Sequence, residues 1–199
     1  DLPITDHCPG YGSAARFTAL STAGAGKDLE AMKTFDDVAI NEIMGRHTGW
    51  LAASSALARR GEQDAPHLIY LPERAFDIDK FLKDVNDVHA ELGYVFVCIG
   101  EGIRDSSGTF IGENKEETIV DAFGHKAITL GSGPAAYLAK LIKENLGLQA
   151  RYNRPGTIQR SYSETISGTD YEEAFLVGEA AVKLALEGKS GLMVILDRK

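Results

Sequence analysis

The sequence predicts an α/β protein, a three-layer sandwich in which helices cover both faces of a mostly parallel sheet. Apolar, β-branched runs alternate along the 199 residues with segments whose apolar residues recur at helical spacing, as in strands joined by right-handed helical crossovers. The run YVFVCIG is continuously apolar, which is typical of a parallel strand buried on both faces. The sheet is therefore expected to be Rossmann-like.

The first third of the chain predicts a loop, a helix and a strand. Residues 1–12 are rich in proline, glycine and aspartate, and Ser13 is a candidate N-cap for a helix over SAARFTALSTAG. The charged residues 25–34 are expected to form an exposed continuation or a connector. The β-branched run at 38–43 then indicates a buried strand, and WLAASSALARR a helix.

The middle third predicts two strands around an amphipathic helix. HLIYLPE is expected to be a short strand ended by Pro72. The helix IDKFLKDVNDVHAELG has Asp77 or Asp79 as its cap and Gly93 as its stop, and the strand YVFVCIGEGI follows. Residues 106–124 are polar and irregular, which indicates an exposed loop or a short helix.

The last third predicts two helices and two strands. Pro134 suits the first turn of the helix AAYLAKLIKENLG, and LQARYNRPGTIQRS indicates a short strand and a basic loop. TDYEEAFLVGEAAVKLALEG is expected to be a helix capped by Thr169 or Asp170, and GLMVILDRK a closing strand.

Composition excludes several classes of protein. The chain is 44% hydrophobic and 25% charged, as in a soluble globular protein of one large or two small domains. Its net charge of -8 argues against a nucleic-acid surface, and no apolar run is long enough to cross a membrane. Cys8 and Cys98 lack CxxC spacing, and Cys98 lies in an apolar run, so a reducing, cytoplasmic setting is expected.

The stretch at 37–50 predicts a ligand-binding corner. A strand ends at Gly45, Arg46, His47, Thr48 and Gly49 before a helix begins, and in open α/β sheets ligands bind beyond the carboxyl ends of the strands. The two glycines let the backbone approach a ligand, and Arg46 offers a fork of donors suited to an anion. The alternative is an ordinary loop with a solvated arginine.

An acidic position and a basic loop are further candidate binding sites. Glu101 follows the strand YVFVCIG between two glycines, where its carboxylate can accept hydrogen bonds from hydroxyl groups; the alternative is a solvated loop acid. The loop at 151–160 holds Arg151, Arg154 and Arg160 in a chain whose net charge is negative, and a phosphate or an acidic partner would relieve their mutual repulsion; the alternative is a set of surface arginines on a turn. The histidines show no metal-ligand spacing, so no metal-binding residue is predicted, and no Walker A, GxGxxG or GxSxG motif occurs.

Five segments occur in an order and spacing that resemble the phosphofructokinase family over nearly the whole chain. They are DLPITDHCPGYGSAARF, EIMGRHTGWLAA, LIYLPE, CIGEGI and RPGTIQR. The resemblance implies a cytoplasmic, homo-oligomeric kinase of glycolysis that phosphorylates the 1-hydroxyl of fructose 6-phosphate, using ATP or pyrophosphate with Mg²⁺. TDHCPGYGSAA and MGRHTGWLAAS resemble the pyrophosphate-dependent branch in particular.

The resemblance also implies roles for individual residues. Met44, Gly45 and Arg46 match the sugar-phosphate site, with Arg46 also neutralising the transferring phosphoryl group, and Glu101 matches the acid that binds the sugar hydroxyls. Arg151 and Arg160 match arginines that hold the 6-phosphate, one of them typically from a neighbouring subunit.

The sequence departs from the family's pattern in two ways. Asp1 matches the last aspartate of a catalytic T-x-D-N-D motif whose first aspartate is the base, so the base itself is not in this chain. Asp37 stands where some members place another phosphate-binding arginine.

We therefore expect an N-terminal portion to be absent. Residues 1–199 are interpreted as the sugar-phosphate-binding portion, with the part from near 155 to 199 returning to the missing donor-binding domain. Alone, the chain is expected to be inactive, and to aggregate or pair through an exposed sheet edge. The alternatives are a non-catalytic module that senses a sugar phosphate and an assembly module.

Overall fold

The computed structural model describes residues 5–112, 118–120, 126–128 and 133–197. The chain divides into two compact units. One comprises residues 18–159, and the other combines residues 1–17 with residues 160–199.

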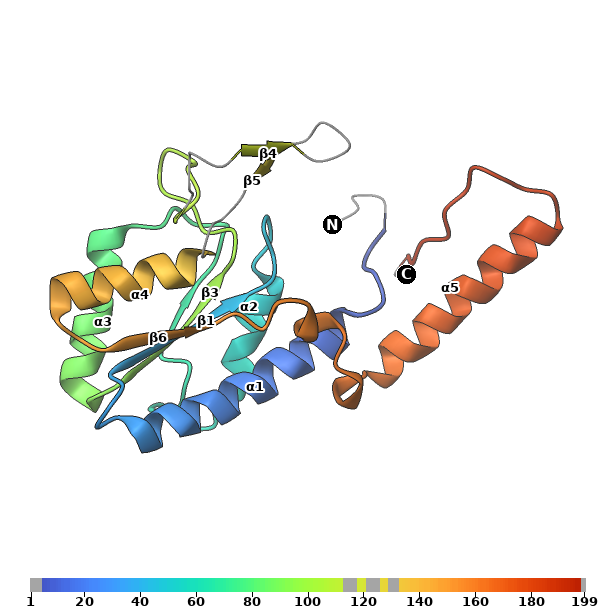
Figure 1. The fold of residues 1–199 in the computed structure, drawn as a ribbon. Coiled ribbons are helices and arrows are strands. Elements are labelled where there is room, and N and C mark those ends of the chain that lie inside the picture. The colour runs from blue at the N-terminus through green and yellow to red at the C-terminus, as the bar shows by residue number, and fades with distance from the viewer. Residues whose placement is uncertain (1–4, 113–117, 121–125, 129–132, 198–199) are drawn as a thin grey trace. The chain divides into compact units, whose positions relative to one another are not determined.

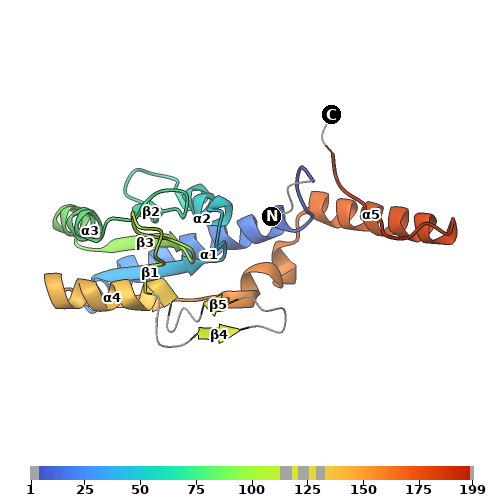
Figure 2. The ribbon, with the colours of Figure 1, turned by 90° about the horizontal axis from the view of Figure 1, so that it is seen from above.

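The larger unit is built on a four-stranded parallel sheet (Figure 1). The strands are β1 (Val38–Ile43), β2 (Leu68–Tyr70), β3 (Val95–Gly100) and β6 (Ala150–Asn153), in the order β2-β3-β1-β6. Figure 2 shows β2, β3 and β1 following one another across the sheet. Because every pairing is parallel, the carboxyl ends of all four strands lie at the same edge.

Helices cover both faces of this sheet, so the predicted three layers are confirmed. Strands β1 and β3 point alternate side chains to opposite faces. On one face, residues such as Val38, Ile40 and Val97 pack with α3 (Ile78–Leu92) and α4 (Gly133–Leu146). On the other, Ala39 and Phe96 pack with α1 (Tyr11–Met32) and α2 (Trp50–Ser54).

Two helices end differently from the expectation. Helix α1 runs on to Met32, so the charged residues after 25 continue it, and Ser13 lies inside the helix rather than capping it. The helix expected over 50–60 is shorter: α2 gives way to the 3-10 helix η1 (Ser55–Ala58). The hydroxyls of Ser54 and Ser55 donate to carbonyls three residues back, which favours the tighter turn.

Helix α3 forms as its sequence predicts. Asp77 is its N-cap and accepts a hydrogen bond from the Lys80 amide. Gly93 ends it in the left-handed conformation, with a φ of 76°.

The segment expected to be a loop or short helix contains a strand instead. Strands β4 (Thr118–Val120) and β5 (Lys126–Ile128) pair antiparallel, which overturns that expectation at 118–120. Three-residue strands are too short for their side-chain pattern to reveal them. Residues 113–117 and 121–124 of the same segment lie outside the described residues.

The smaller unit is mainly helical. It holds the first turns of α1, the 3-10 helix η3 (Ser163–Thr165) and α5 (Gly168–Leu186), while η2 (Gly156–Arg160) belongs to the larger unit except for its last residue, Arg160. The N-cap of α5 is Ser167, not Thr169 or Asp170.

The closing strand expected over 191–199 is not formed in the described residues up to 197. Among the described residues, its backbone is bonded to residues 5 and 6 at Leu196 alone: the Leu196 carbonyl accepts from the Asp6 amide at 2.9 Å and from the Thr5 hydroxyl at 3.1 Å, and the Leu196 amide donates to Thr5 Oγ1 at 3.1 Å. An apolar run needs a neighbouring strand to become part of a sheet, and here it has no ladder partner.

Candidate anion-binding site

The corner after β1 is a tight turn that only glycine permits. Gly45 has a φ of 131°, in the region that side chains disfavour. A Cβ atom at this position would lie 2.3 Å from the carbonyl oxygen of Thr48. The turn therefore exposes the backbone of Gly45 at the carboxyl edge, directly beside Met44 and Arg46.

The structure brings Glu101 to this corner, because β1 and β3 are neighbours. The Glu101 amide donates to the Ile43 carbonyl at 2.9 Å, which continues the ladder past the ends of both strands. The Glu101 carboxylate in turn accepts a hydrogen bond from the Gly45 amide at 3.2 Å. At Gly102 the two loops touch, since a Cβ there would lie 1.8 Å from the Arg46 carbonyl oxygen.

The Arg46 side chain is exposed and has no hydrogen bond or ion pair among the described residues. Next to it, a terminal nitrogen of Arg104 lies 3.1 Å from His47 Nδ1. The Arg104 guanidinium also stacks on Phe110, 4.0 Å from the ring centre. The outer side of the corner thus carries two guanidinium groups, which suits an anion.

Gln159 supports the corner from η2, and sequence reasoning missed it. Its side chain is 3% exposed, and its Oε1 accepts a hydrogen bond from the Met44 amide at 3.1 Å. Its amide nitrogen donates to the Gly156 carbonyl. No local signal marks this glutamine, because its partner lies 115 positions away.

Glu42 is a second residue that sequence reasoning missed. It is only 4% exposed, although β1 is otherwise mostly apolar. Its carboxylate accepts hydrogen bonds from Arg154 Nε at 2.8 Å and from the Ala135 amide, in the first turn of α4, at 3.1 Å. Burial raises the pKa of this carboxyl above its ordinary value, although both donors act to lower it. The signal in the sequence that could have identified Glu42 is a carboxylate inside an otherwise mostly apolar strand.

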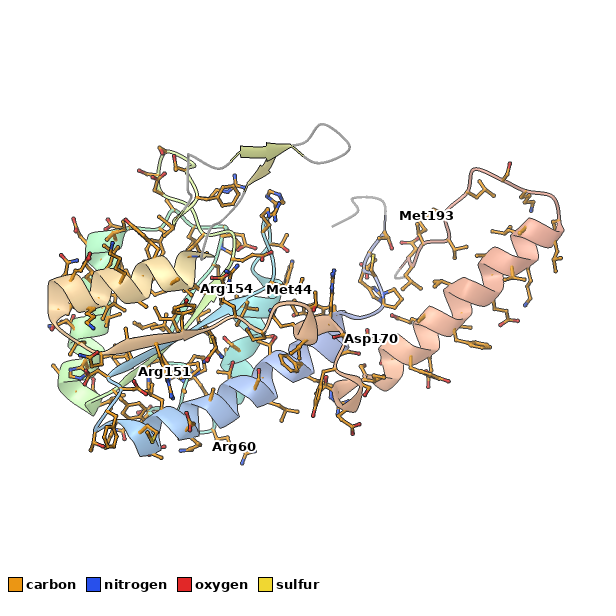
Figure 3. The ribbon with its side chains drawn as sticks, viewed as in Figure 1. Met44, Arg60, Arg151, Arg154, Asp170 and Met193 are labelled. Carbon is orange, nitrogen blue, oxygen red and sulfur yellow. The ribbon has the colours of Figure 1, made fainter. Side chains whose placement is uncertain are left out.

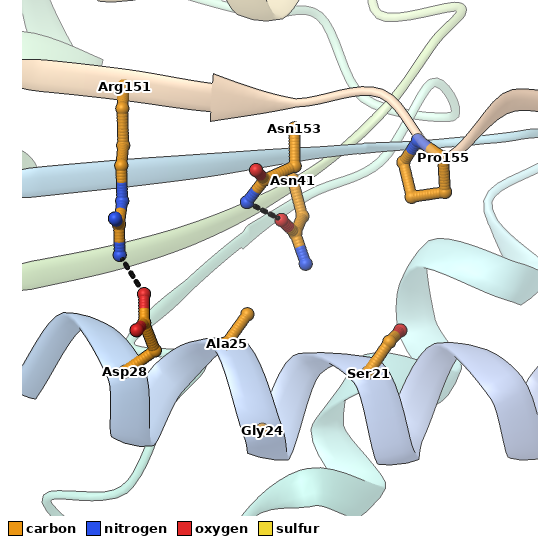
Figure 4. A pocket seen from close by; sticks show the side chains of 8 residues that line it. All are labelled: Ser21, Gly24, Ala25, Asp28, Asn41, Arg151, Asn153 and Pro155. Atoms are coloured by element: carbon orange, nitrogen blue, oxygen red, sulfur yellow. Dashed lines mark hydrogen bonds and ion pairs between the residues drawn. The ribbon is translucent and has the colours of Figure 1, made fainter.

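Arg151 lies away from the corner. In the register of the sheet it faces Ala39, four positions before Ile43, whereas Arg154 follows the end of β6. Its terminal nitrogens contact Asp28 at 2.6 Å and Asp36 at 3.2 Å. It lines a separate hollow of about 380 Å³ (Figure 4). The other residues that line this hollow are Ser21, Gly24, Ala25, Asp28, Asn41, Asn153 and Pro155.

The remaining predicted positions are not brought to the corner. Arg160 ends η2, is exposed, and belongs to the smaller unit. Asp1 lies outside the described residues. Asp37, the position that departs from the family's pattern, holds the fold together instead: its carboxylate accepts from the Gln149 amide at 2.7 Å and lies 3.2 Å from His89 Nε2.

The described residues include no group of three or more His, Cys, Asp or Glu side chains that could hold a metal ion. By themselves, the described residues therefore do not fit a metal site. Among the described helices, none is both long and apolar enough to span a membrane.

The fold and the corner define an α/β protein with a candidate anion-binding site at the carboxyl edge of its sheet. A family model described as phosphofructokinase matches residues 1–185. The chain belongs to the phosphofructokinase family, which confirms the resemblance.

Individual relatives and a solved structure are also similar to the chain. A pyrophosphate–fructose 6-phosphate 1-phosphotransferase of Xanthomonas campestris pv. campestris is 43% identical over 199 residues, all of this chain and 46% of the relative. A sulfofructose kinase of Alkalicoccus urumqiensis is 35% identical over 198 residues, covering 100% of this chain and 49% of that protein. The crystal structure of a pyrophosphate-dependent phosphofructokinase from Marinobacter aquaeolei matches with a TM-score of 0.77 and 36% identity, over 100% of this chain and 45% of that one. The chain thus spans about half the length of the curated relatives it matches.

Proposed function

We propose that this chain supplies the sugar-phosphate site of a phosphofructokinase that transfers a phosphoryl group to the 1-hydroxyl of fructose 6-phosphate in glycolysis. The observation that carries the proposal is the meeting of Met44, Gly45 and Arg46 with Glu101 at the carboxyl edge of two adjacent strands. Pyrophosphate is the favoured donor, with ATP as the alternative, because relatives 40–43% identical to the chain are named for pyrophosphate.

In this proposal each part of the corner has a distinct task. The exposed Arg46 guanidinium neutralises charge on the transferring phosphoryl group and on the sugar phosphate. Glu101 accepts hydrogen bonds from the sugar hydroxyls through the carboxylate oxygen that the Gly45 amide leaves free. The backbone of Met44 and Gly45, fixed by Gln159 and Glu101, lies against the sugar.

The other predicted residues remain part of the proposal. Arg160 is assigned to the 6-phosphate of the sugar. Arg151 lies in a separate hollow of this chain, which fits an arginine that serves a ligand held by a neighbouring copy in a homo-oligomer. Asp1 is assigned to the catalytic motif that it resembles.

The proposal extends to the surroundings of the site. Residues from near 155 to 199 are assigned to contacts with a donor-binding domain. Mg²⁺ is expected to accompany the phosphoryl donor in the whole enzyme, and a cytoplasmic location is proposed. Of the described residues, none is assigned to the metal.

Calorimetric titration tests the sugar site directly. Fructose 6-phosphate is expected to bind the wild-type chain, and Arg46→Ala is expected to weaken binding by roughly tenfold or more, because a charge-assisted hydrogen bond is lost. The matched control is Arg60→Ala, which removes an exposed arginine beyond the far end of η1. Equal binding by Arg46→Ala and wild type would remove Arg46 from the site.

Turnover is tested separately. We expect no phosphorylation of fructose 6-phosphate by this chain with Mg²⁺ and either pyrophosphate or ATP, since the chain spans about half the length of the relatives it matches. Measurable turnover would contradict that expectation. Tight binding of sulfofructose in preference to fructose 6-phosphate would instead favour the activity named for the Alkalicoccus relative.

A further inference from the structure

The ion pair between Glu42 and Arg154 is built at the same edge of the sheet as the corner. Below it, the register pairs Asn41 with Asn153, and their side-chain amides are joined by a hydrogen bond of 2.9 Å. At the next position of each chain segment, Arg154 Nε, just past the end of β6, donates to Glu42 Oε1 at 2.8 Å. Figure 3 shows Arg154 and Met44 at the same end of β1, with Arg151 further back. The register thus places Arg154 close to the corner.

The backbone around this pair is shaped to let it form. Gly133, at the start of α4, has a φ of 81°. A Cβ atom there would lie 2.5 Å from Glu42 Oε2 and 2.9 Å from Arg154 Cζ. A residue with a side chain would therefore collide with both partners. The first turn of α4, through the Ala135 amide, fixes the second carboxylate oxygen.

Only one end of Arg154 is used by this arrangement. Nε is bonded to Glu42, whereas the two terminal nitrogens have no hydrogen bond or ion pair among the described residues. The Arg154 side chain is 39% exposed, while that of Glu42 is 4% exposed. The carboxylate is thus enclosed, and the guanidinium extends from it into solvent.

We propose that Arg154 is a further phosphate-binding residue of the site, and that Glu42 is its positioning residue. The inference rests on the proposed function and adds to it a further residue for the dianionic phosphate of the sugar phosphate monoester. A planar guanidinium held through Nε keeps two parallel N–H donors for two phosphate oxygens. Glu42 removes the freedom of a long side chain before the ligand arrives, which lowers the entropic loss on binding.

A purely structural ion pair explains the arrangement less well. Burying a carboxylate is unfavourable, and apolar residues of similar volume often stabilise a protein as much as a buried pair does. The retained pair and the glycine that accommodates it are explained if the exposed donors have a ligand.

Two ligands of the same shape test the inference. Fructose 6-phosphate carries about -1.5 to -2 charges near neutral pH, whereas fructose 6-sulfate carries a single one. Each is titrated calorimetrically into the wild-type chain and into Arg154→Ala, Arg154→Lys and Glu42→Gln, with Arg60→Ala as the control. Melting temperatures establish that each variant is folded.

The expected result is a change in selectivity. Arg154→Ala is expected to weaken fructose 6-phosphate binding by roughly tenfold or more, and fructose 6-sulfate binding by less, so that the preference for phosphate falls. Glu42→Gln, which keeps the guanidinium but loosens its hold, is expected to lower the same preference by a smaller factor. Glu42→Gln is expected to add nothing in the Arg154→Ala background, because its effect passes through Arg154.

Other outcomes overturn the inference in distinguishable ways. Folded Arg154→Ala with unchanged affinity and unchanged selectivity would show a purely structural pair. If Arg154→Ala does not fold, Glu42→Gln and Arg154→Lys decide: an unaltered phosphate preference in both overturns the inference, and a reduced one supports it. A folded wild-type chain that binds no fructose 6-phosphate overturns the proposed function, and with it the ligand named here. Wild-type binding with unaffected variants overturns this inference alone.

Discussion

At the scale of single residues, two glycines determine the shape of the corner. Gly45 provides the left-handed turn, and Gly102 lets the loop after β3 touch the backbone of Arg46. Both contacts are between main-chain atoms, which cannot move aside as the end of a flexible side chain can. The position of the candidate anion-binding donors is therefore set by backbone packing.

Gly102→Ala is expected to break this contact. The new methyl group would lie 1.8 Å from the Arg46 carbonyl oxygen, so the two loops must separate. We expect a loss of stability of about 1–3 kcal/mol, the usual range for overpacking, together with weaker fructose 6-phosphate binding. Urea denaturation measures the first effect and calorimetry the second.

The matched control is Gly24→Ala in α1. Nothing lies within 4 Å of a Cβ at Gly24, which sits on an exposed part of a regular helix. This change is expected to stabilise the chain by about 0.5–1 kcal/mol, because alanine loses less backbone entropy in a helix. Equal effects of the two substitutions would mean that the loops do not touch as described.

The residues around the corner show where prediction from sequence succeeds. Met44, Gly45, Arg46 and Glu101 were each predicted at the end of a buried strand, and the family resemblance placed them in one sugar-phosphate site; the structure brings Glu101 to the Gly45 amide. Gln159 was not predicted, because its role depends on a contact between distant segments.

Arg151 and Arg154 show a second limit. Along the chain they are equivalent members of one basic loop, but the strand register separates their surroundings. Arg151 is held by Asp28 and Asp36, whereas Arg154 extends from Glu42 at the carboxyl edge. Sequence spacing reveals the charges, and only the register reveals which of the two lies at the carboxyl edge of the sheet.

At the scale of elements, α1 is capped from outside its own sequence. The Asp170 carboxylate, in the first turn of α5, accepts hydrogen bonds of 2.6 Å from both the amide and the hydroxyl of Ser13. Burial alone would raise the pKa of Asp170, but these bonds and those from the Gly10 and Gly12 amides hold it below its ordinary value. A single carboxylate therefore joins the starts of two helices.

Asp170→Ala is expected to destabilise the smaller unit. Loss of an N-cap acceptor costs about 0.5–2 kcal/mol, and here the same change also leaves the Ser13 hydroxyl without its acceptor. Chemical denaturation followed by circular dichroism measures the loss. Wild-type stability in this variant would mean that α1 finds another acceptor.

The same carboxylate gives a prediction for pH. Because its pKa is lowered on folding, its stabilisation is complete above the ordinary aspartate value of about 3.9 and is lost as the pH falls through the lower, folded value. Asp170→Asn keeps an acceptor oxygen without the charge, so its stability is expected to fall less than that of wild type over this acid range. Parallel acid unfolding curves for the two proteins would contradict this.

Element prediction succeeded where the signal is local. Asp77 and Gly93 mark both ends of α3, and a strong helical period connects them. The prediction of a closing strand after α5 was wrong, because an apolar run indicates only that a segment prefers burial. Whether it becomes a strand depends on a partner, and near Leu196 the described chain offers only residues 5 and 6.

At the scale of the whole chain, the alternation of strands and helices predicted the layers but not the order of the strands. Strand β1 lies between β3 and β6, so its neighbours are more than 50 and 100 positions away in the sequence. Parallel pairing requires such crossovers, and no local pattern specifies which strands become neighbours.

Helix α5 leaves many apolar side chains uncovered among the described residues. Asp170 is its only buried residue, although the helix is rich in apolar side chains. The exposed ones include Phe175 at 67% and Leu186 at 84%. A helix that is apolar around its circumference is stable in water only when something covers it.

We therefore predict that the chain self-associates through α5, and more strongly near its isoelectric point of 5.1 than at pH 7, where a net charge of -8 opposes association. Replacing Phe175 and Leu186 together by serine should lower the mass measured by light scattering at both pH values. The control is Leu57→Ser, which removes one exposed apolar side chain from η1 and should leave the mass unchanged. A wild-type chain that stays monomeric at every concentration would contradict the prediction, and an equal effect of Leu57→Ser would place the association outside α5.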